Sequence, residues 1–228
     1  MQKTAYATQK FDTPAPIRAE VDIPAGRIQF IAADRADTVV EVRPADPARK
    51  RDVTAVEEIS AVFGDGVLRI AAAEAPHAFL GHSGSVEVTV MLPAGSRVEA
   101  KADAAEFRSV GRLGDVAFAG GHRSVHVDEA ASARLTAHDG EVSVGRLGGP
   151  AEISVQKGGI RIGEAVRGTL TLAVQHGDIT VGAAPGVSAS LDAETGYGRI
   201  DNSLRNTGTR DLDVHATTAH GDITARSL

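Results

Sequence analysis

Apolar and polar residues alternate in short runs along the whole chain. Runs such as Leu135-Thr136-Ala137 and Ile153-Ser154-Val155 place every second side chain on the same face. This alternation is typical of a β-strand with one buried face. In the second half, each run is followed by a short turn and another run, so the pattern predicts units of strand, tight turn, strand and glycine-containing corner.

The turns of the second half carry a repeated Gly-x-(Ile/Val) triplet. The steps between successive apolar anchors are 18, 19, 21 and 23 residues. Glycine adopts positive φ at little cost, which suits it to tight turns. The predicted structural turn residues are Gly140, Gly158, Gly177, Gly198 and Gly221.

Two short strands cannot bury an apolar face alone, whereas stacked units of about 18–20 residues form a continuous core. We therefore predict an all-β fold in which residues 97–228 form a β-solenoid-like stack. Residues 11–96 predict a less regular, antiparallel β region, with strands at 18–23, 27–32, 38–43, 59–63, 67–71 and 85–92 and one or two helical turns at 52–58. No linker of distinct composition separates the two parts, so we expect one continuous domain.

Composition excludes several classes of protein. The 228 residues contain no Cys, which excludes a disulfide framework, a thiolate metal site and a cysteine nucleophile. The net charge of −6 is spread along the chain and argues against a nucleic-acid partner. No apolar run approaches a membrane span or the core of a signal peptide, so we expect a cytoplasmic protein without membrane insertion.

The best candidates for chemistry are histidines beside the turns. His176-Gly177-Asp178 and His220-Gly221-Asp222 are identical, and stacked His and Asp side chains are able to bind a metal. The unit between them in sequence carries Tyr197 at the same position, and the unit before them carries Lys157. These side chains would interrupt a row of metal ligands along the stack. We therefore expect ordinary turn residues, with no catalytic residue, no metal site and no cofactor. Tyr197 alone offers an aromatic face for a carbohydrate at a turn.

The end of the chain predicts an interaction site. The last unit, 221–228, stops without the polar cap that repeat proteins normally need. An uncapped strand exposes unpaired backbone groups. We therefore predict an interaction edge at Ile223, Thr224 and Ala225, used for self-association or by a protein partner.

Three sets of segments carry a resemblance to a known family. They are the (Ile/Leu)-Pro-Ala-Gly segments at 23–26 and 92–95, the two Ser-Val-Gly-Arg-Leu-Gly copies at 109–114 and 143–148, and the final Ala219-His220-Gly221-Asp222-Ile223-Thr224. Together they resemble the bacterial putative-adhesin family of β-strand-repeat domains of unknown function, over residues 11–228. The Arg-rich composition, 19 Arg against 5 Lys, is similar to that of actinobacterial members.

The resemblance implies a β-solenoid-like fold and supplies no catalytic residue. The regular repeats and the lack of a convergent set of reactive side chains agree with this resemblance. Together they favour a non-enzymatic scaffold or protein-interaction module that is adhesin-like. The alternative is a surface-adhesion or carbohydrate- or ligand-binding module placed outside the cell. An enzyme whose residues converge from separate units is the least favoured class.

Overall fold

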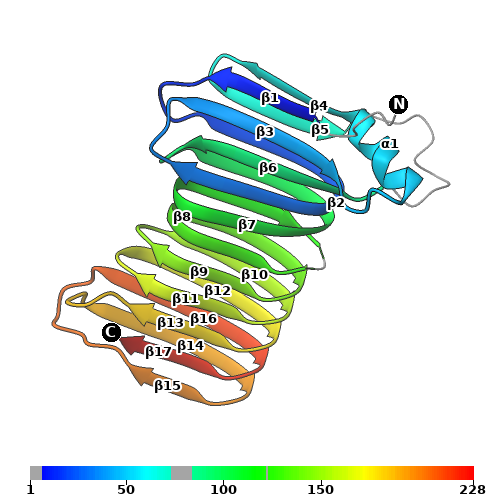
Figure 1. The fold of residues 1–228 in the computed structure, drawn as a ribbon. Helices are drawn as coiled ribbons and strands as arrows, with labels where there is room; N and C mark the ends of the chain where they lie inside the picture. Colours follow the sequence, from blue (N-terminus) through cyan, green and yellow to red (C-terminus); the bar gives the residue numbers. More distant parts are fainter. Residues whose placement is uncertain (1–6, 73–83, 122) are drawn as a thin grey trace.

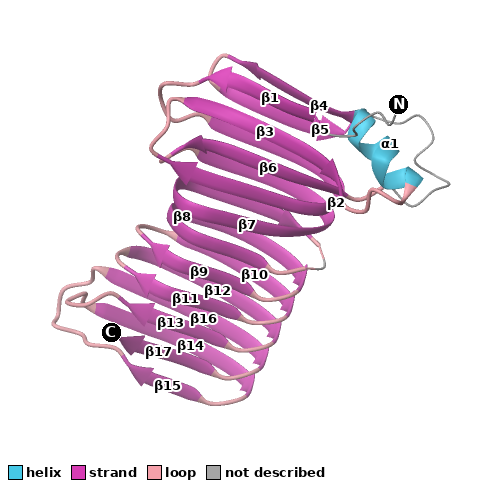
Figure 2. Cartoon of the chain, viewed as in Figure 1, coloured by secondary structure: helices cyan, strands magenta, loops and turns pink. Residues whose placement is uncertain are grey.

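The computed structural model describes residues 7–72, 84–121 and 123–228. In these residues the chain forms 17 strands and one helix, and the strand pairings join into one open sheet. Figure 2 shows strands along the whole length of the molecule and the helix at one end. The all-β fold expected from the alternating pattern is confirmed.

The N-terminal region contains both antiparallel and parallel pairs. Its elements are β1 (Ala7–Asp12), β2 (Arg18–Ala33), β3 (Asp37–Pro44), α1 (Lys50–Glu58), β4 (Ile59–Gly64), β5 (Val67–Ala72) and β6 (Val86–Pro93). The pairs β1–β3, β3–β6 and β4–β5 are antiparallel. The two strands predicted at 18–23 and 27–32 form the single strand β2, because the chain bends at Gly26, where φ is +132°, without leaving the ladder.

In the described residues, every pairing of the remaining strands is parallel. They are β7 (Arg97–Gly120), β8 (Val125–Asp139), β9 (Val142–Leu147), β10 (Ala151–Lys157), β11 (Ile160–Ala165), β12 (Gly168–His176), β13 (Ile179–Ala183), β14 (Ala189–Tyr197), β15 (Ile200–Ser203), β16 (Leu212–His220) and β17 (Ile223–Ser227). The register repeats the spacing read from the sequence, since Val142 lies beside Ile160 and Ile160 beside Ile179.

The pairings trace two arrays of strands. The first array runs β5, β2, β7, β8, β10, β12, β16, β14. The second array runs β6, β2, β7, β8, β9, β11, β13, β17, β15. The long strands β2, β7 and β8 bend and contribute to both arrays, whereas a tight turn joins the two strands of each later pair, such as β10 and β11 (Figure 1).

The inward side chains of both arrays form one hydrophobic core. Near β2 and β7 it holds aromatic rings, with the Phe30 and Phe107 centroids 5.8 Å apart and those of Phe107 and Phe118 5.1 Å apart. Toward the C-terminal end the core consists of Val, Ile, Leu and Ala side chains. Burial of this apolar surface is the main force that holds the arrays together.

Strand order departs from chain order at one end of the molecule. The pair β16–β17, which we call the inserted pair, lies between β12–β13 and β14–β15. The pair β14–β15, which we call the end pair, is therefore outermost although it comes earlier in the chain. In Figure 1 the red strands of the inserted pair lie between the yellow and orange strands.

Candidate functional site

The five predicted turn glycines lie in one row across neighbouring strand pairs. A Cβ on Gly158 would lie 2.2 Å from the backbone oxygen of Gly140, and one on Gly177 would lie 2.1 Å from that of Gly158. The row continues through Gly221 to Gly198, where the corresponding distances are 2.0 and 1.9 Å. No side chain fits at such distances. Glycine is therefore required in this row by the close approach of neighbouring backbones as well as by the conformation of the turns.

The aspartates that follow the glycines connect one turn to the next. Asp178 Oδ1 accepts a hydrogen bond from the backbone N–H of Asp222 at 2.8 Å. Asp222 Oδ1 in turn accepts one from the backbone N–H of Arg199 at 2.8 Å. This backbone hydrogen bond, with a second one from the Arg199 guanidinium, holds the pKa of Asp222 below its ordinary value. The aspartates therefore have a structural role in this row.

The histidines beside the turns stack on one another. The rings of His176 and His220 are 4.9 Å apart and nearly parallel, and Tyr197 stacks on the other face of His220 at 5.0 Å. The sequence argument that Tyr197 separates the two histidines was wrong, because the inserted pair brings His220 directly beside His176. Among the described residues, no three His, Asp or Glu side chains gather into a group that could hold a metal ion.

The structure corrects the position of the predicted interaction edge. Ile223, Thr224 and Ala225 lie in β17, which pairs with β13 on one side and β15 on the other. The side chains of Ile223 and Ala225 are buried. Chain order suggested that the last unit would be outermost, whereas the tertiary fold inserts it one position inside.

The open end of the stack is instead formed by the end pair. β14 pairs only with β16, and β15 only with β17, so one side of each strand has no ladder partner among the described residues. Tyr197 is 75% exposed and Ile200 46% exposed, although Ile200 is in register with the buried Ile223. Asn202 occupies the position in register with Ala225 and is also exposed.

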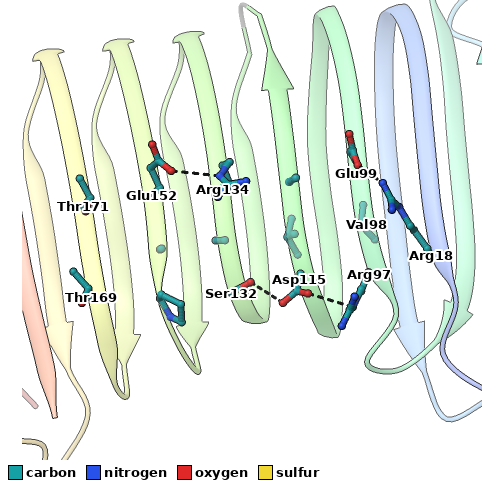
Figure 3. Close-up of a pocket in the computed structure, with 15 residues that line it drawn as sticks. Arg18, Arg97, Val98, Glu99, Asp115, Ser132, Arg134, Glu152, Thr169 and Thr171 are labelled. Atoms are coloured by element: carbon teal, nitrogen blue, oxygen red, sulfur yellow. Dashed lines mark hydrogen bonds and ion pairs between the residues drawn. The ribbon is translucent and has the colours of Figure 1, made fainter.

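A shallow groove of about 540 Å³ crosses the outward side of the first array. Figure 3 shows side chains of several parallel strands around it. The groove is lined by Arg18 of β2, by Arg97, Val98, Glu99, Asp115, Val116 and Ala117 of β7, by Ser132, Ala133 and Arg134 of β8, by Pro150, Ala151 and Glu152 at β10, and by Thr169 and Thr171 of β12. The lining thus combines the longer charged side chains with core residues such as Val116 and Ala133, which are buried.

The charges in the groove form three ion pairs, two between neighbouring strands and one, Arg97–Asp115, between two parts of the bent strand β7. Arg97 Nε is 3.2 Å from Asp115 Oδ2, and the Ser132 hydroxyl donates a hydrogen bond of 2.7 Å to Asp115 Oδ1. Arg134 Nε is 3.3 Å from Glu152 Oε2. A third pair joins Arg18 and Glu99 at 2.8 Å, so the lining has three arginines, three carboxylates and no net charge.

None of the patterns described in the sequence predicted this groove. A usable signal was present, because Arg97 and Asp115 are 18 residues apart, as are Arg134 and Glu152. Opposite charges one repeat apart come to lie side by side on the outward face of neighbouring parallel segments.

One solved structure has the same fold along the whole chain. A putative adhesin from Bacteroides fragilis NCTC 9343 has a TM-score of 0.56 and 14% identity, covering 99% of this chain and 98% of its own. This chain shares its fold. At that identity the likeness concerns the fold alone.

Two further solved structures are more distant. A putative cell adhesion protein from Clostridium sporogenes ATCC 15579 has a TM-score of 0.41 and 12% identity, covering 98% of this chain and 100% of its own. A putative lipid binding protein from Parabacteroides distasonis ATCC 8503 has a TM-score of 0.43 and 13% identity, covering 96% of each chain.

The chain matches no family model. It also matches no curated protein. No helix among the described residues is long and apolar enough to cross a membrane.

Proposed function

We propose that this protein is a non-enzymatic, adhesin-like interaction module that self-associates through its end pair. In this proposal the two arrays are the two sides of a β-solenoid, with residues 97–228 as its repeat part and 11–96 as an N-terminal part of the same domain. The observation that carries the proposal is the open end, where β14 and β15 each have no partner on one side within the described part of the chain.

The chemistry of the end pair supports association. Unpaired N–H and C=O groups of an edge strand are a template for pairing with another strand. Four large apolar side chains are exposed among the described residues, and two of them, Tyr197 and Ile200, belong to the end pair. A second copy related by a two-fold axis presents the same edge in the antiparallel direction, so β14 would pair with its own copy.

Light scattering over a wide range of concentration tests this proposal. The mass should rise toward that of a dimer, and Ile200→Lys should keep the protein monomeric because a lysine on an edge strand blocks pairing. Val62→Lys is the matched control, since Val62 is 63% exposed on β4 at the opposite end. A mass of one chain at every concentration, or equal effects of both variants, would contradict the proposal.

A second candidate function is carbohydrate binding in the groove of the first array. Its lining is neutral overall and rich in paired charges and hydroxyls, including Ser132, Thr169 and Thr171. Such a surface suits a neutral, hydroxyl-rich chain better than a polyanion, because hydrogen bonds rather than net charge would hold it. The proposed ligand is therefore a neutral polysaccharide.

Calorimetric titration with neutral polysaccharides tests this second candidate. Arg134→Ala combined with Glu152→Ala should weaken binding, whereas Arg161→Ala combined with Glu141→Ala, a similar exposed pair joined at 3.4 Å, should not. Absence of heat with every polysaccharide would rule the groove out as such a site.

The cytoplasmic location, the absence of nucleic-acid and membrane partners and the similarity to actinobacterial family members all stay predictions. Cell fractionation separates the two functional candidates. A protein found only in the cytoplasm favours the self-associating scaffold, and one found at the cell surface favours adhesion through the groove.

A further inference from the structure

The inserted pair occupies a slot bounded by strands that come earlier in the chain. On one side, residues 168–176 of β12 pair with residues 212–220 of β16, and on the other side residues 189–197 of β14 pair with the same residues. The strands β13 and β15 bound β17 in the same way. Both β12 and β14 pair with β16 in the same register. If β16 were absent, β14 would therefore be able to pair directly with β12 in that register.

Burial explains why the last pair goes inside. The inward side chains of the inserted pair are Leu212, Val214, Ala216, Thr218, Ile223 and Ala225, and all of them are buried. The end pair has Ala189, Leu191, Ala193, Thr195, Ile200 and Asn202 at the same register positions. The main difference is Asn202 in place of Ala225, and the more apolar unit is more stable where strands cover it on both sides. The slot is therefore matched to the final segment.

The inserted pair is held in the slot by backbone ladders and by specific side-chain contacts on both sides. Thr218 Oγ1 donates to the backbone oxygen of Gly177 at 3.0 Å, and Thr195 Oγ1 donates to that of Gly221 at 2.9 Å. The stacked rings of His176, His220 and Tyr197 span all three neighbouring strands. These contacts depend on the segment that fills the slot and not on the chain that supplies it.

The connection to the inserted pair can serve as a hinge. Residues 204–211 join β15 to β16, and residues 205–211 are exposed. They are fastened mainly at the buried Ser188, whose Oγ accepts from the Thr207 N–H at 2.9 Å and whose N–H donates to Asp211 Oδ2 at 3.1 Å. Eight extended residues reach up to about 27 Å, several times the ~4.8 Å spacing between strands.

We propose that the slot also accepts residues 212–228 of a second copy, so that two molecules exchange their inserted pairs and form a closed dimer. This inference goes beyond the proposed function, because exchange uses the slot and the hinge and leaves the outer edge of the end pair free. Exchange of residues 212–228 adds no strain outside the hinge, because every contact of the slot is made again in the dimer. Association of end pairs without exchange is the competing mode.

Chemical crosslinking distinguishes the two modes. The chain contains no Cys, so Thr171→Cys with His215→Cys provides the only thiols, on adjacent positions of β12 and β16. The control is Glu152→Cys with Thr171→Cys, on β10 and β12, which do not exchange. Each variant is unfolded, refolded at low and at high concentration, treated with a short bismaleimide and separated on a denaturing gel.

The crosslinked dimer of the first variant should increase with refolding concentration, while the control should give only crosslinked monomer. Monomer bands for both variants, in samples that light scattering shows to be dimeric, would overturn exchange and leave association of end pairs intact. Equal dimer bands for both variants would also overturn it, because they indicate contacts outside the slot.

A peptide experiment on the unmodified chain covers the case in which the cysteine variants fail to fold. A fluorescent peptide of residues 212–228, present during refolding, should co-elute with the protein by filling the slot in place of its own segment. The same peptide carrying Ile223→Asp should not, because position 223 is 1% exposed in the slot. Failure of the native peptide to bind, or equal binding of both peptides, would contradict the proposal.

Discussion

The inserted pair and the end pair are built on the same template but have different surroundings. Each has a nine-residue strand, a turn that contains Gly221 or Gly198, and a shorter strand that begins with Ile223 or Ile200. Ile223 is 1% exposed and Ile200 is 46% exposed. The comparison shows that position in the stack, rather than the local pattern, decides how much a residue contributes to stability.

The different surroundings of the two pairs also predict different effects of substitution, on stability in the inserted pair and on association in the end pair. Side chains of the inserted pair are enclosed by strands on both sides, so substitutions there should unfold the end of the stack. Side chains of the end pair border solvent on one side, so substitutions there should mainly change association. Matched substitutions at register-equivalent positions therefore test the assignment of the two pairs.

The largest effect is expected for a charge in the inserted pair. Ala225→Asp should lower the free energy of unfolding by about 4 kcal/mol or more, because it buries an unpaired carboxylate. Asn202→Asp, in register on β15, should cost at most about 0.5 kcal/mol because position 202 is exposed. Chemical denaturation of both variants measures the difference. Equal losses would mean that the end pair is as enclosed as the inserted pair.

Removal of an apolar side chain should show the same contrast with a smaller size. Ile223→Ala should cost about 3 kcal/mol through lost burial and a residual cavity, and Ile200→Ala less than about 1 kcal/mol. Urea unfolding curves, with the slope checked for constancy, give both values. A loss at position 200 that matches the one at 223 would contradict the strand order.

The turn glycines should be intolerant of alanine wherever a neighbouring turn lies against them. Gly221→Ala should cost about 2 kcal/mol or more, because the new Cβ would lie 2.0 Å from the Gly177 oxygen and φ is +150°. Gly64→Ala is the control, since no described atom beyond its chain neighbours lies within 4 Å of its Cβ position. Thermal unfolding should separate the two variants, and an unchanged midpoint for Gly221→Ala would refute the close approach of the turns.

The smallest effect is expected at Asp222, which joins the two pairs. Its lowered pKa means that the carboxylate stabilises the fold above the ordinary value of 3.8, and that this contribution disappears as pH falls through the folded pKa. Asp222→Asn should therefore be slightly less stable than the natural protein at neutral pH and equal to it at strongly acidic pH. Unfolding midpoints across the acidic range measure this, and a constant difference at all pH values would show that ionisation of Asp222 is not involved.

Asp37, at the opposite end of the molecule, also has a lowered pKa. Hydrogen bonds from Arg35 and Lys10 lower the pKa of Asp37 to about 2. An NMR titration of the carboxylates should find Asp37 ionised well below pH 3.8, and Arg35→Ala should return its pKa toward that value. An unchanged titration in Arg35→Ala would exclude the guanidinium as the cause.

Much of the architecture was predictable from the residues themselves. Alternation within runs such as Ile153-Ser154-Val155 located the strands, and Gly158 and Gly177 located turns, because both signals depend on neighbours in the chain. The 18- and 19-residue steps predicted which residues of β9, β11 and β13 lie side by side. Helix α1 was expected as one or two turns at 52–58 and spans Lys50–Glu58.

The order of the last two pairs was decided only by the tertiary structure. The sequence by itself determined that 189–203 and 212–227 each form a strand, a glycine turn and a strand. Both pairs fit on β12–β13 in the same register, so local pattern and spacing do not choose between them. The two possible strand orders differ in the total apolar surface that the stack buries. Placing the more apolar pair inside buries more of it and is therefore favoured. The exposed edge at Tyr197 and Ile200, the His176–His220 stack and the enclosure of Ile223 all follow from that placement.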